Sequence, residues 1–462
     1  MTADSYSVLY NGIQEHISNF ISSYRYVGAL VYKLLSLTGH NPIVNPRADI
    51  VLFILIVGIS SAVLSLIIAE KTEKRDLLSL LVIDAGVMVS VVNVWYCNIL
   101  LFPECIFLMA AGTLFCFTGI ALYCSLNGIY KYIGALPFII LSTGVYQQFI
   151  TVFAIFIIAV VSAENLNKQR AKFKPLALSY LKPAVMLILG AGIYFVLGKI
   201  ICSSFGLEKN ARIIFSLESV FEQLKYFMLK QHSYLSGRGY FDTEILTLCY
   251  FAVGLIWLVS LVIEYKKSKS LMRSAFLIIT AAGAYVISYI LCIFSDSNAV
   301  RALFGVFAVF FLFTFETISL TKKKIPAVLA LCVLLILIPI NLVKDVQGLN
   351  ELKAENYADE TYADKINEAV ADYENKSGTT VTKLEYCYDS ENNLNKNSVL
   401  YVGWGVKPII NLGRMKTDRP VFECGKMSEE KKAEIFGEGN FTDFDSKTQI
   451  VFSSDAVYLC VY

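Results

Sequence analysis

The chain has 462 residues, of which 56% are hydrophobic and only 17% are charged. Ordinary soluble proteins carry about 25% charged residues, so the composition and the mean hydropathy of +0.58 exclude a typical soluble enzyme. The net charge of +2 also excludes a general basic surface for nucleic acid, and we expect no nucleic-acid partner. Long apolar blocks fill the chain before about residue 344, and the remainder has a soluble composition.

The N-terminal segment, residues 1–48, contains two short amphipathic pieces rather than a membrane span. They cover 5–21 and 26–37. Their length and alternating polarity are typical of helices that lie in the membrane interface.

Ten stretches that follow are apolar enough to cross a membrane as helices, which need about 20 such residues. The predicted spans are 49–69, 77–96, 104–124, 132–146, 147–163, 179–202, 244–264, 274–294, 302–320 and 325–343. The fourth and fifth are short and meet at Tyr146–Gln147, which suggests a tight hairpin. The sequence therefore predicts a mainly α-helical polytopic membrane bundle over residues 1–343, which includes the interfacial helices at 1–48.

Basic residues alternate strictly between the loops of this bundle. Lys131 and four basic loops occupy one set, at 70–76, 167–174, 265–273 and 321–324. Because Lys and Arg accumulate in cytoplasmic loops, we expect this set to face the cytoplasm. The N-terminal segment and everything after the last span would then lie outside.

Residues 344–462 have the pattern of a small extracytoplasmic α/β domain. A polar helix is expected at about 348–375, strands at 380–388 and 399–406, and a helix at 428–436 that Ser428 caps. Two strands joined by a Ser-Ser-Asp turn are expected at the end of the chain. Three cysteines in this region leave one disulfide or none as open alternatives.

Two kinds of charged residue could carry chemistry on the outer side. Asp4 could act as a general base or could cap the first amphipathic helix. Arg25, Arg238 and Arg301 could each grip a phosphate through two nitrogens, or each could extend alone to the lipid headgroups. Further polar residues that could bind a substrate on this side are Glu104, Tyr146, Gln147, His232 and Asp296.

Cofactor motifs are not found in the sequence. It has no phosphate-binding loop of the ATPase type and no zinc-ligand spacing, so the sequence identifies no cofactor, although a divalent cation could assist.

Several stretches together resemble the GtrII-like membrane glucosyltransferases, which belong to the GT-C class. They are ADSYS near the start, YRYVGALVYKLL at 24–35, LFPECIFLMAAG at 101–112, LSTGVYQQFITVF at 141–153 and the terminal FDSKTQIVFSSDAVYLCVY. The "YQ" turn is the most specific of these. The family pattern places an acidic residue in the first outer loop, and Asp4 stands at the matching position. The family also places a spanning helix before that residue, and we expect one to precede Met1.

The resemblance implies a GT-C-like fold in a bacterial cytoplasmic membrane. It implies transfer of a sugar, typically glucose, from an undecaprenyl-phosphate carrier to a cell-surface glycan. Asp4 would deprotonate the acceptor and the arginines would stabilise the phosphate in one inverting displacement. Two alternatives stay open, namely a polymerase or ligase of lipid-linked units and, less favoured, a flippase or transporter. A transporter needs charges along the membrane, where only Asp84 and Lys199 qualify.

Overall fold

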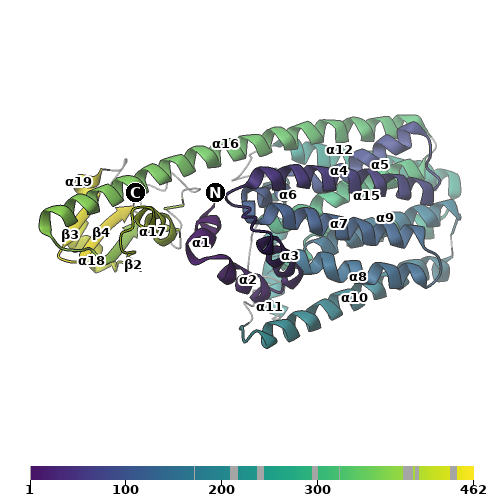
Figure 1. Cartoon of the computed structure of the whole chain (residues 1–462). Helices are drawn as coiled ribbons and strands as arrows, with labels where there is room; N and C mark the ends of the chain where they lie inside the picture. The colour runs from purple at the N-terminus through teal and green to yellow at the C-terminus, as the bar shows by residue number, and fades with distance from the viewer. Residues whose placement is uncertain are drawn as a thin grey trace. The chain divides into compact units, whose positions relative to one another are not determined.

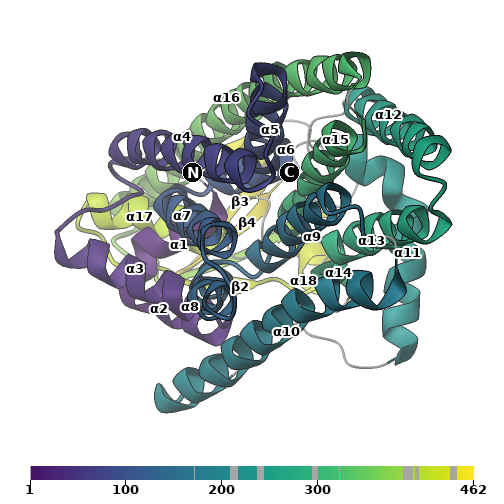
Figure 2. The same cartoon turned by 90° about the vertical axis from the view of Figure 1, so that its right-hand side faces the viewer.

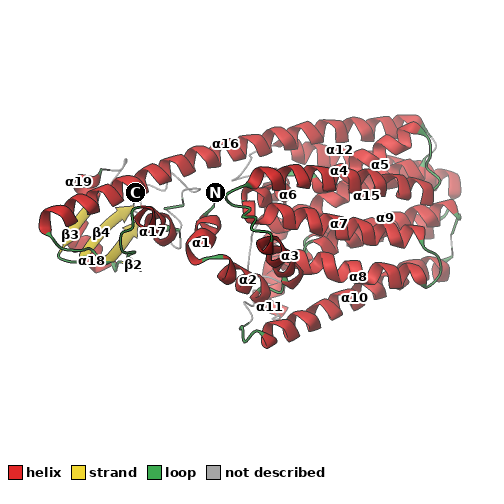
Figure 3. Cartoon of the chain, in the orientation of Figure 1, coloured by secondary structure: helices red, strands yellow, loops and turns green. Residues whose placement is uncertain are grey.

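The structure is a computed structural model, and it describes residues 2–170, 172–208, 217–236, 244–293, 300–321, 323–388, 399–400, 405–437 and 445–461. The chain forms two compact units, and most of it is helical (Figures 1 and 3). One unit is the helical bundle, residues 17–100 and 104–348. The other contains residues 1–16, 101–103 and 349–462, and we call it the C-terminal unit.

The bundle is built from apolar helices joined by short turns. In chain order they are α2 (Ile13–Ser22), α3 (Tyr26–Leu37), α4 (Pro46–Lys71), α5 (Leu77–Val91), α6 (Val94–Asn98), η1 (Ile99–Leu101), α7 (Pro103–Ser125), α8 (Tyr130–Val145), α9 (Phe149–Asn167), α10 (Phe173–Ser204), α11 (Leu217–Ser236), α12 (Glu244–Ser268), α13 (Leu271–Ser288), α14 (Ile290–Ile293), η2 (Val300–Phe307), α15 (Ala308–Leu320) and the first half of α16 (Lys324–Ser377). Within the described residues, nine helical segments are long and apolar enough to cross a membrane.

The predicted spans at 132–146 and 147–163 form two helices, α8 and α9, that meet at a turn, as expected. The first is only 16 residues long, contains Pro137 and falls short of the length of a full span, which explains nine candidates instead of ten. The prediction of a single amphipathic element at 5–21 is wrong. This segment forms two helices, α1 (Ala3–Asn11) and α2, because the backbone turns at Gly12, which has a left-handed φ of +88°.

The centre of the bundle is formed by α9 and by the continuous segment Leu303–Leu320, which comprises the end of η2 and α15 (Figure 2); 83% and 89% of their apolar stretches are buried. Phe156 of α9 stacks on Phe311 of α15 with ring centroids 4.1 Å apart. Gly86 of α5 makes room for that ring, because a Cβ there would lie 3.0 Å from Phe311. Aromatic stacking and the close contact at Gly86 therefore determine how α5, α9 and α15 pack against one another, which hydrophobicity alone does not specify.

The basic loops meet at one end of the bundle, on the right in Figure 1. Asn167 donates to the Thr72 carbonyl at 2.9 Å, and the Lys74 ammonium donates to the Ile318 carbonyl at 2.9 Å. Arg273 donates through Nε to the Arg170 carbonyl at 3.1 Å. The alternation of basic and non-basic loops thus corresponds to two real ends of the bundle, while the side of the membrane each faces stays a prediction.

The second half of α16 belongs to the C-terminal unit, so the span at 325–343 and the polar helix expected at 348–375 are one helix of 54 residues. The remaining elements of the C-terminal unit are β1 (Lys383–Tyr388), α17 (Val406–Lys416), β2 (Glu423–Lys426), α18 (Glu429–Phe436), α19 (Ser446–Gln449), β3 (Ile450–Ser453) and β4 (Ala456–Val461). The strands form one sheet in the order β2-β1-β4-β3, in which β1 is parallel to β2 and β4, and β3 is antiparallel to β4.

Most of the expectations for this region are confirmed. The first strand, the Ser428-capped helix and the terminal pair of strands are present. The strand expected at 399–406 is different, because Val399 and Leu400 lie in a turn and Val406 begins α17. Residues 401–404 lie outside the described residues. Within the described residues, Cys387, Cys424 and Cys460 are not joined by a disulfide.

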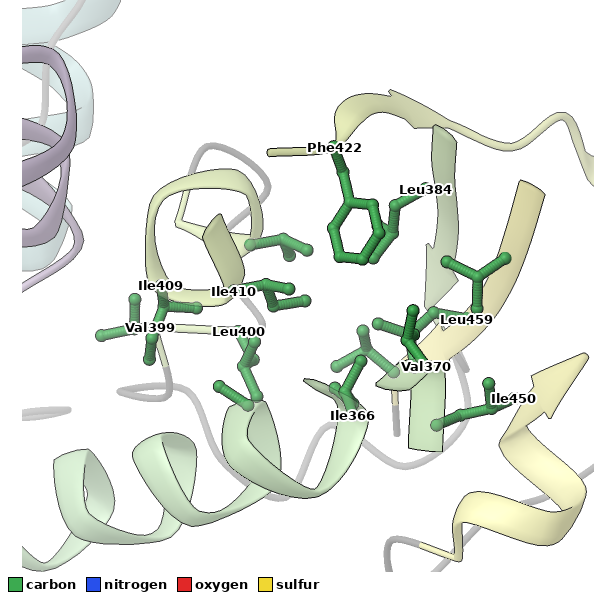
Figure 4. Close-up of a cluster of buried hydrophobic side chains, with 14 of the residues drawn as sticks. Ile366, Val370, Leu384, Val399, Leu400, Ile409, Ile410, Phe422, Ile450 and Leu459 are labelled. Carbon is green, nitrogen blue, oxygen red and sulfur yellow. The ribbon is translucent and has the colours of Figure 1, made fainter. Parts of the chain in front are cut away.

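The core of the C-terminal unit is a cluster of aliphatic and aromatic side chains between α16, α17 and the sheet (Figure 4). Val370, Leu384 and Ile410 are fully buried in it. Tyr6 of α1 is also part of this cluster and is 4% exposed. The first helix of the chain is therefore an integral part of the C-terminal unit.

Candidate functional site

Two of the motifs that were singled out in the sequence come together in the bundle. The guanidinium of Arg25, in the motif Tyr24-Arg25-Tyr26, lies 4.7 Å from the ring centre of Tyr146, a cation–π distance. Its Nε donates to Oε1 of Gln147 at 3.4 Å. We call this cluster of Arg25, Tyr146 and Gln147 the arginine end of the bundle.

Local structure fixes the direction of Arg25. Tyr24 has a left-handed φ of 59°, which is rare outside glycine and turns the chain sharply between α2 and α3. Gln147 secures that turn, since its Nε2 donates to the Ser23 carbonyl at 2.8 Å and to the Tyr194 hydroxyl at 3.0 Å. The amide of Gln147 thus connects the turn that carries Arg25 to α10.

Half of the Arg25 guanidinium stays available to a ligand. Arg25 is partly exposed, and within the described residues its two Nη groups have no hydrogen-bonding partner. Guanidinium groups prefer paired contacts with carboxylate or phosphate oxygens. The protein therefore holds one edge of the group and leaves the other able to receive an anion.

The element η2 extends this cluster on the other side of Tyr146. Phe304 stacks on the Tyr146 ring with centroids 5.9 Å apart. Arg301 lies three residues before Phe304 in η2, and its side chain lies outside the described residues.

A buried amide sits directly behind the arginine end. Gln148 is fully buried, and its Nε2 donates to the Ser288 carbonyl at 3.1 Å. Its Oε1 has no hydrogen-bonding partner within the described residues. A Cβ on Gly305 would lie 2.8 Å from the same amide, so η2 approaches it closely. Gln148 thus ties the hairpin of α8 and α9 to α13 and η2.

Asp4 belongs to the C-terminal unit. It is not the cap of α1, because Thr2 occupies that position and accepts the Ser5 backbone N–H through its hydroxyl. The Asp4 side chain is half-buried, and no hydrogen bond or ion pair holds its carboxylate within the described residues. The capping alternative is therefore excluded, and the carboxylate is available for chemistry.

The C-terminal unit holds α1, and with it Asp4, through specific contacts. The Tyr6 hydroxyl donates to Oε1 of Glu360 on α16 at 2.6 Å, and Nδ2 of Asn411 on α17 donates to the Tyr10 hydroxyl at 3.3 Å. Burial, followed by the hydrogen bond to Glu360, raises the pKa of Tyr6 well above its ordinary range, so this hydroxyl stays a donor. The position of Asp4 thus depends on a domain that lies more than 300 residues later in the chain.

Glu104, a predicted substrate-binding residue, is enclosed instead of open. It is 2% exposed in the first turn of α7. Burial raises the pKa of the neighbouring Tyr32 hydroxyl, and the carboxylate of Glu104 adds to that rise. A substrate that contacts Glu104 would have to displace the side chains packed around it.

Sequence reasoning missed a pair in the same region that consists of a partly exposed histidine and a buried aspartate. Nε2 of His40 lies 3.0 Å from both carboxylate oxygens of Asp49, which is 1% exposed in the first turn of α4. A carboxylate on one ring nitrogen fixes the tautomer of a histidine. The only signal for this pair in the sequence is that His40 lies in the loop before a helix whose first turn contains Asp49.

The other predicted site residues cannot be placed in the cluster. Arg238 and Asp296 lie outside the described residues, and so does the side chain of His232 in α11. In the part of the chain that the structure describes, no group of three His, Cys, Asp or Glu residues has the arrangement of a metal site.

These features define a helical membrane protein with an arginine, an aromatic ring and an amide gathered at one end of its bundle. The family model of the glucosyl transferase GtrII matches residues 2–318, so the chain belongs to this family of membrane glucosyltransferases. The match includes Asp4 and the arginine end, and it ends before α16 and the sheet. The comparisons found no matching curated protein and no matching solved structure.

Proposed function

We propose that this chain moves a glucosyl group from an undecaprenyl-phosphate carrier to a cell-surface glycan on the outer side of the membrane. The observation that carries the proposal is the half-occupied guanidinium of Arg25, held by Tyr146 and Gln147. The carrier is a phosphodiester, and an arginine with two unpartnered Nη groups has the geometry for its phosphate oxygens. Tyr146 and Gln147 support the proposal by positioning Arg25, since the ring contacts the guanidinium and the amide accepts its Nε–H while donating to Ser23 and Tyr194.

The reaction is a single displacement at C1 of the sugar. The carboxylate of Asp4 takes the proton of an acceptor hydroxyl, whose oxygen then bonds to C1. The bond from C1 to the phosphate oxygen breaks, and its electron pair stays on the phosphate, which changes from a diester to a more highly charged monoester. Arg25 stabilises that added charge, as preorganised cations do when charge develops in a transition state. The configuration at C1 inverts.

Other functions have less support from the structure. A transporter would place charges along a common path, but Asp84 and Lys199 are both exposed on different helices, and Asp84 accepts a hydrogen bond from Ser65 at 3.1 Å. A polymerase or ligase would need a diphosphate-linked oligosaccharide. Supplying either that donor or glucosyl undecaprenyl phosphate to the purified chain distinguishes the two enzymes.

The test of the base is Asp4→Asn, which keeps the shape of the side chain and removes its ability to accept a proton. With radiolabelled glucosyl undecaprenyl phosphate and envelope glycan from the source cells as acceptor, transfer should fall by about 10²- to 10⁴-fold. Glu15→Gln, an exposed acid in the first turn of α2, should transfer at the normal rate. Near-normal turnover by a folded Asp4→Asn protein would remove Asp4 as the base, and His40→Gln would then be tested.

The outer location of the reaction can be tested separately with cysteines at the two ends of the bundle. Phe205, the C-cap residue of α10, and Lys266 of α12 are both exposed. A membrane-impermeant maleimide added to whole cells should label Phe205→Cys and should label Lys266→Cys only after the membrane is opened. The reverse pattern would place the arginine end in the cytoplasm and contradict the proposed location.

A further inference from the structure

Three lysines from three helices surround one carboxylate at the end of the bundle opposite Arg25. Nζ of Lys71, the last residue of α4, lies 3.7 Å from Oε1 of Glu164, and Nζ of Lys168, the C-cap residue of α9, lies 3.6 Å from Oε2. Lys131 in the first turn of α8 joins them, since its ammonium interacts electrostatically with Glu164 and with both other lysines. We call this cluster of Lys71, Lys131 and Lys168 the lysine end.

The cluster carries more positive charge than its carboxylate can balance. Glu164 uses one oxygen for Lys71 and the other for Lys168. The nearby Glu70 does not change this balance, because it pairs with Arg75. Two positive charges therefore remain at a site whose members Lys71 and Glu164 have side chains only 21% and 18% exposed.

The helix dipole favours the positions of two of these lysines and disfavours the position of the third. Lys71 and Lys168 stand at helix C-termini, where a cation is favoured. Lys131 stands at a helix N-terminus, where a cation is disfavoured. Its ammonium is held there by aromatic groups, 4.5 Å from the ring centre of Tyr123 and 5.1 Å from that of Tyr132.

The start of α8 adds donors to the same place. Its N-cap residue, Ile129, forms no side-chain hydrogen bond to the first turn. The N–H groups of Tyr132 and Ile133 already donate to the Ile129 carbonyl, so the N–H groups that can attract an anion are those of the residues before them. The half-buried Lys131 stands beside this helix start and forms no ion pair with a carboxylate within the described residues, an arrangement that favours binding of an anion.

We propose that the lysine end binds the headgroup of an anionic phospholipid of the phosphatidylglycerol class. The phosphate would lie between Lys131, Lys168 and the start of α8, and the acyl chains would lie along the exposed apolar side chains of Ile129, Tyr130 and Ile133, which are 61%, 70% and 59% exposed. Basic pockets between membrane helices recognise such headgroups. This inference is independent of the proposed transfer reaction.

The test uses the full chain in nanodiscs of phosphatidylcholine, with retention of added phosphatidylglycerol measured by native mass spectrometry. Wild type should retain phosphatidylglycerol in preference to phosphatidylcholine. Lys131→Gln and Lys168→Gln should each weaken retention by about fivefold, as expected for one lysine near a membrane surface. Lys266→Gln is the matched control, an exposed lysine of α12 in one of the other basic loops, and should change nothing.

The variant Glu164→Gln separates this proposal from a purely structural ion cluster. Removing the carboxylate leaves three lysines unopposed, so an anion site should bind phosphatidylglycerol more tightly. A cluster that exists only to hold helices together would lose stability without any gain in lipid affinity, and that result would overturn the proposal. Displacement of the lipid by millimolar inorganic phosphate would assign the site to a soluble phosphate and would also overturn it.

Discussion

At the arginine end one guanidinium is held by an aromatic ring and an amide, whereas at the lysine end two ammonium groups pair with one carboxylate and a third lies over aromatic rings beside them. Both ends place a cation over a tyrosine ring, Arg25 over Tyr146 and Lys131 over Tyr123. The difference lies in what holds the charge. Gln147 orients the planar guanidinium of Arg25, and the two Nη groups that remain can donate to one phosphate in one orientation. The lysine end offers compact charges without a fixed direction, which suits a membrane lipid better than a reacting group.

The largest effect that this comparison predicts is on the rate of transfer. Arg25→Gln should lower kcat by about 10²- to 10³-fold, since it removes the charge that stabilises the leaving phosphate. Arg25→Lys should also slow the reaction although the charge is kept, because the forked contact is lost. Lys131→Gln should leave the transfer rate unchanged. Equal losses from the two glutamine variants would show that the ends do not differ in function.

A smaller effect should follow from moving α3 without changing any charge. A Cβ on Gly144 would lie 2.5 Å from Cγ2 of Val27, so Gly144→Ala must push α3, and Arg25 with it, away from α8. We expect a loss of about tenfold in kcat, since small misplacements of a positioned group are costly. Gly192→Ala in α10 is the control, because a Cβ there meets no atom within 4 Å. Equal rates in the two alanine variants would mean that the packing of α3 does not set the reactive geometry.

The sequence allowed the apolar helices of the bundle to be predicted because hydropathy is a local signal. It did not allow α16 to be predicted as one helix. The composition changes from apolar to polar near Lys344, but nothing there stops a helix, and Gly348 lies inside it. The opposite error occurred at Gly12, where the amphipathic pattern continues across a break in the backbone.

The arginine end was predictable as separate residues but not as a cluster. Arg25 was predicted because it lies at the start of a helix, and Gln147 because it lies in a turn. The two residues are 122 positions apart in the chain. Their contact depends on close packing of Val27 against Gly144, which no local pattern reveals. His40 and Asp49 were missed because a single histidine in a loop has no periodicity to interpret.

Binding of the carrier itself tests the central claim most directly. Undecaprenyl phosphate without a sugar would be titrated into the purified chain in nanodiscs that contain phosphatidylglycerol, which keeps the lysine end occupied, with Arg25→Gln and Lys131→Gln measured alongside wild type. Loss of hydrogen bonds to a charged group should weaken carrier binding by Arg25→Gln by about tenfold or more, and Lys131→Gln should bind as wild type does. Undiminished carrier binding by a folded Arg25→Gln protein would contradict the assignment of the arginine end to the donor phosphate.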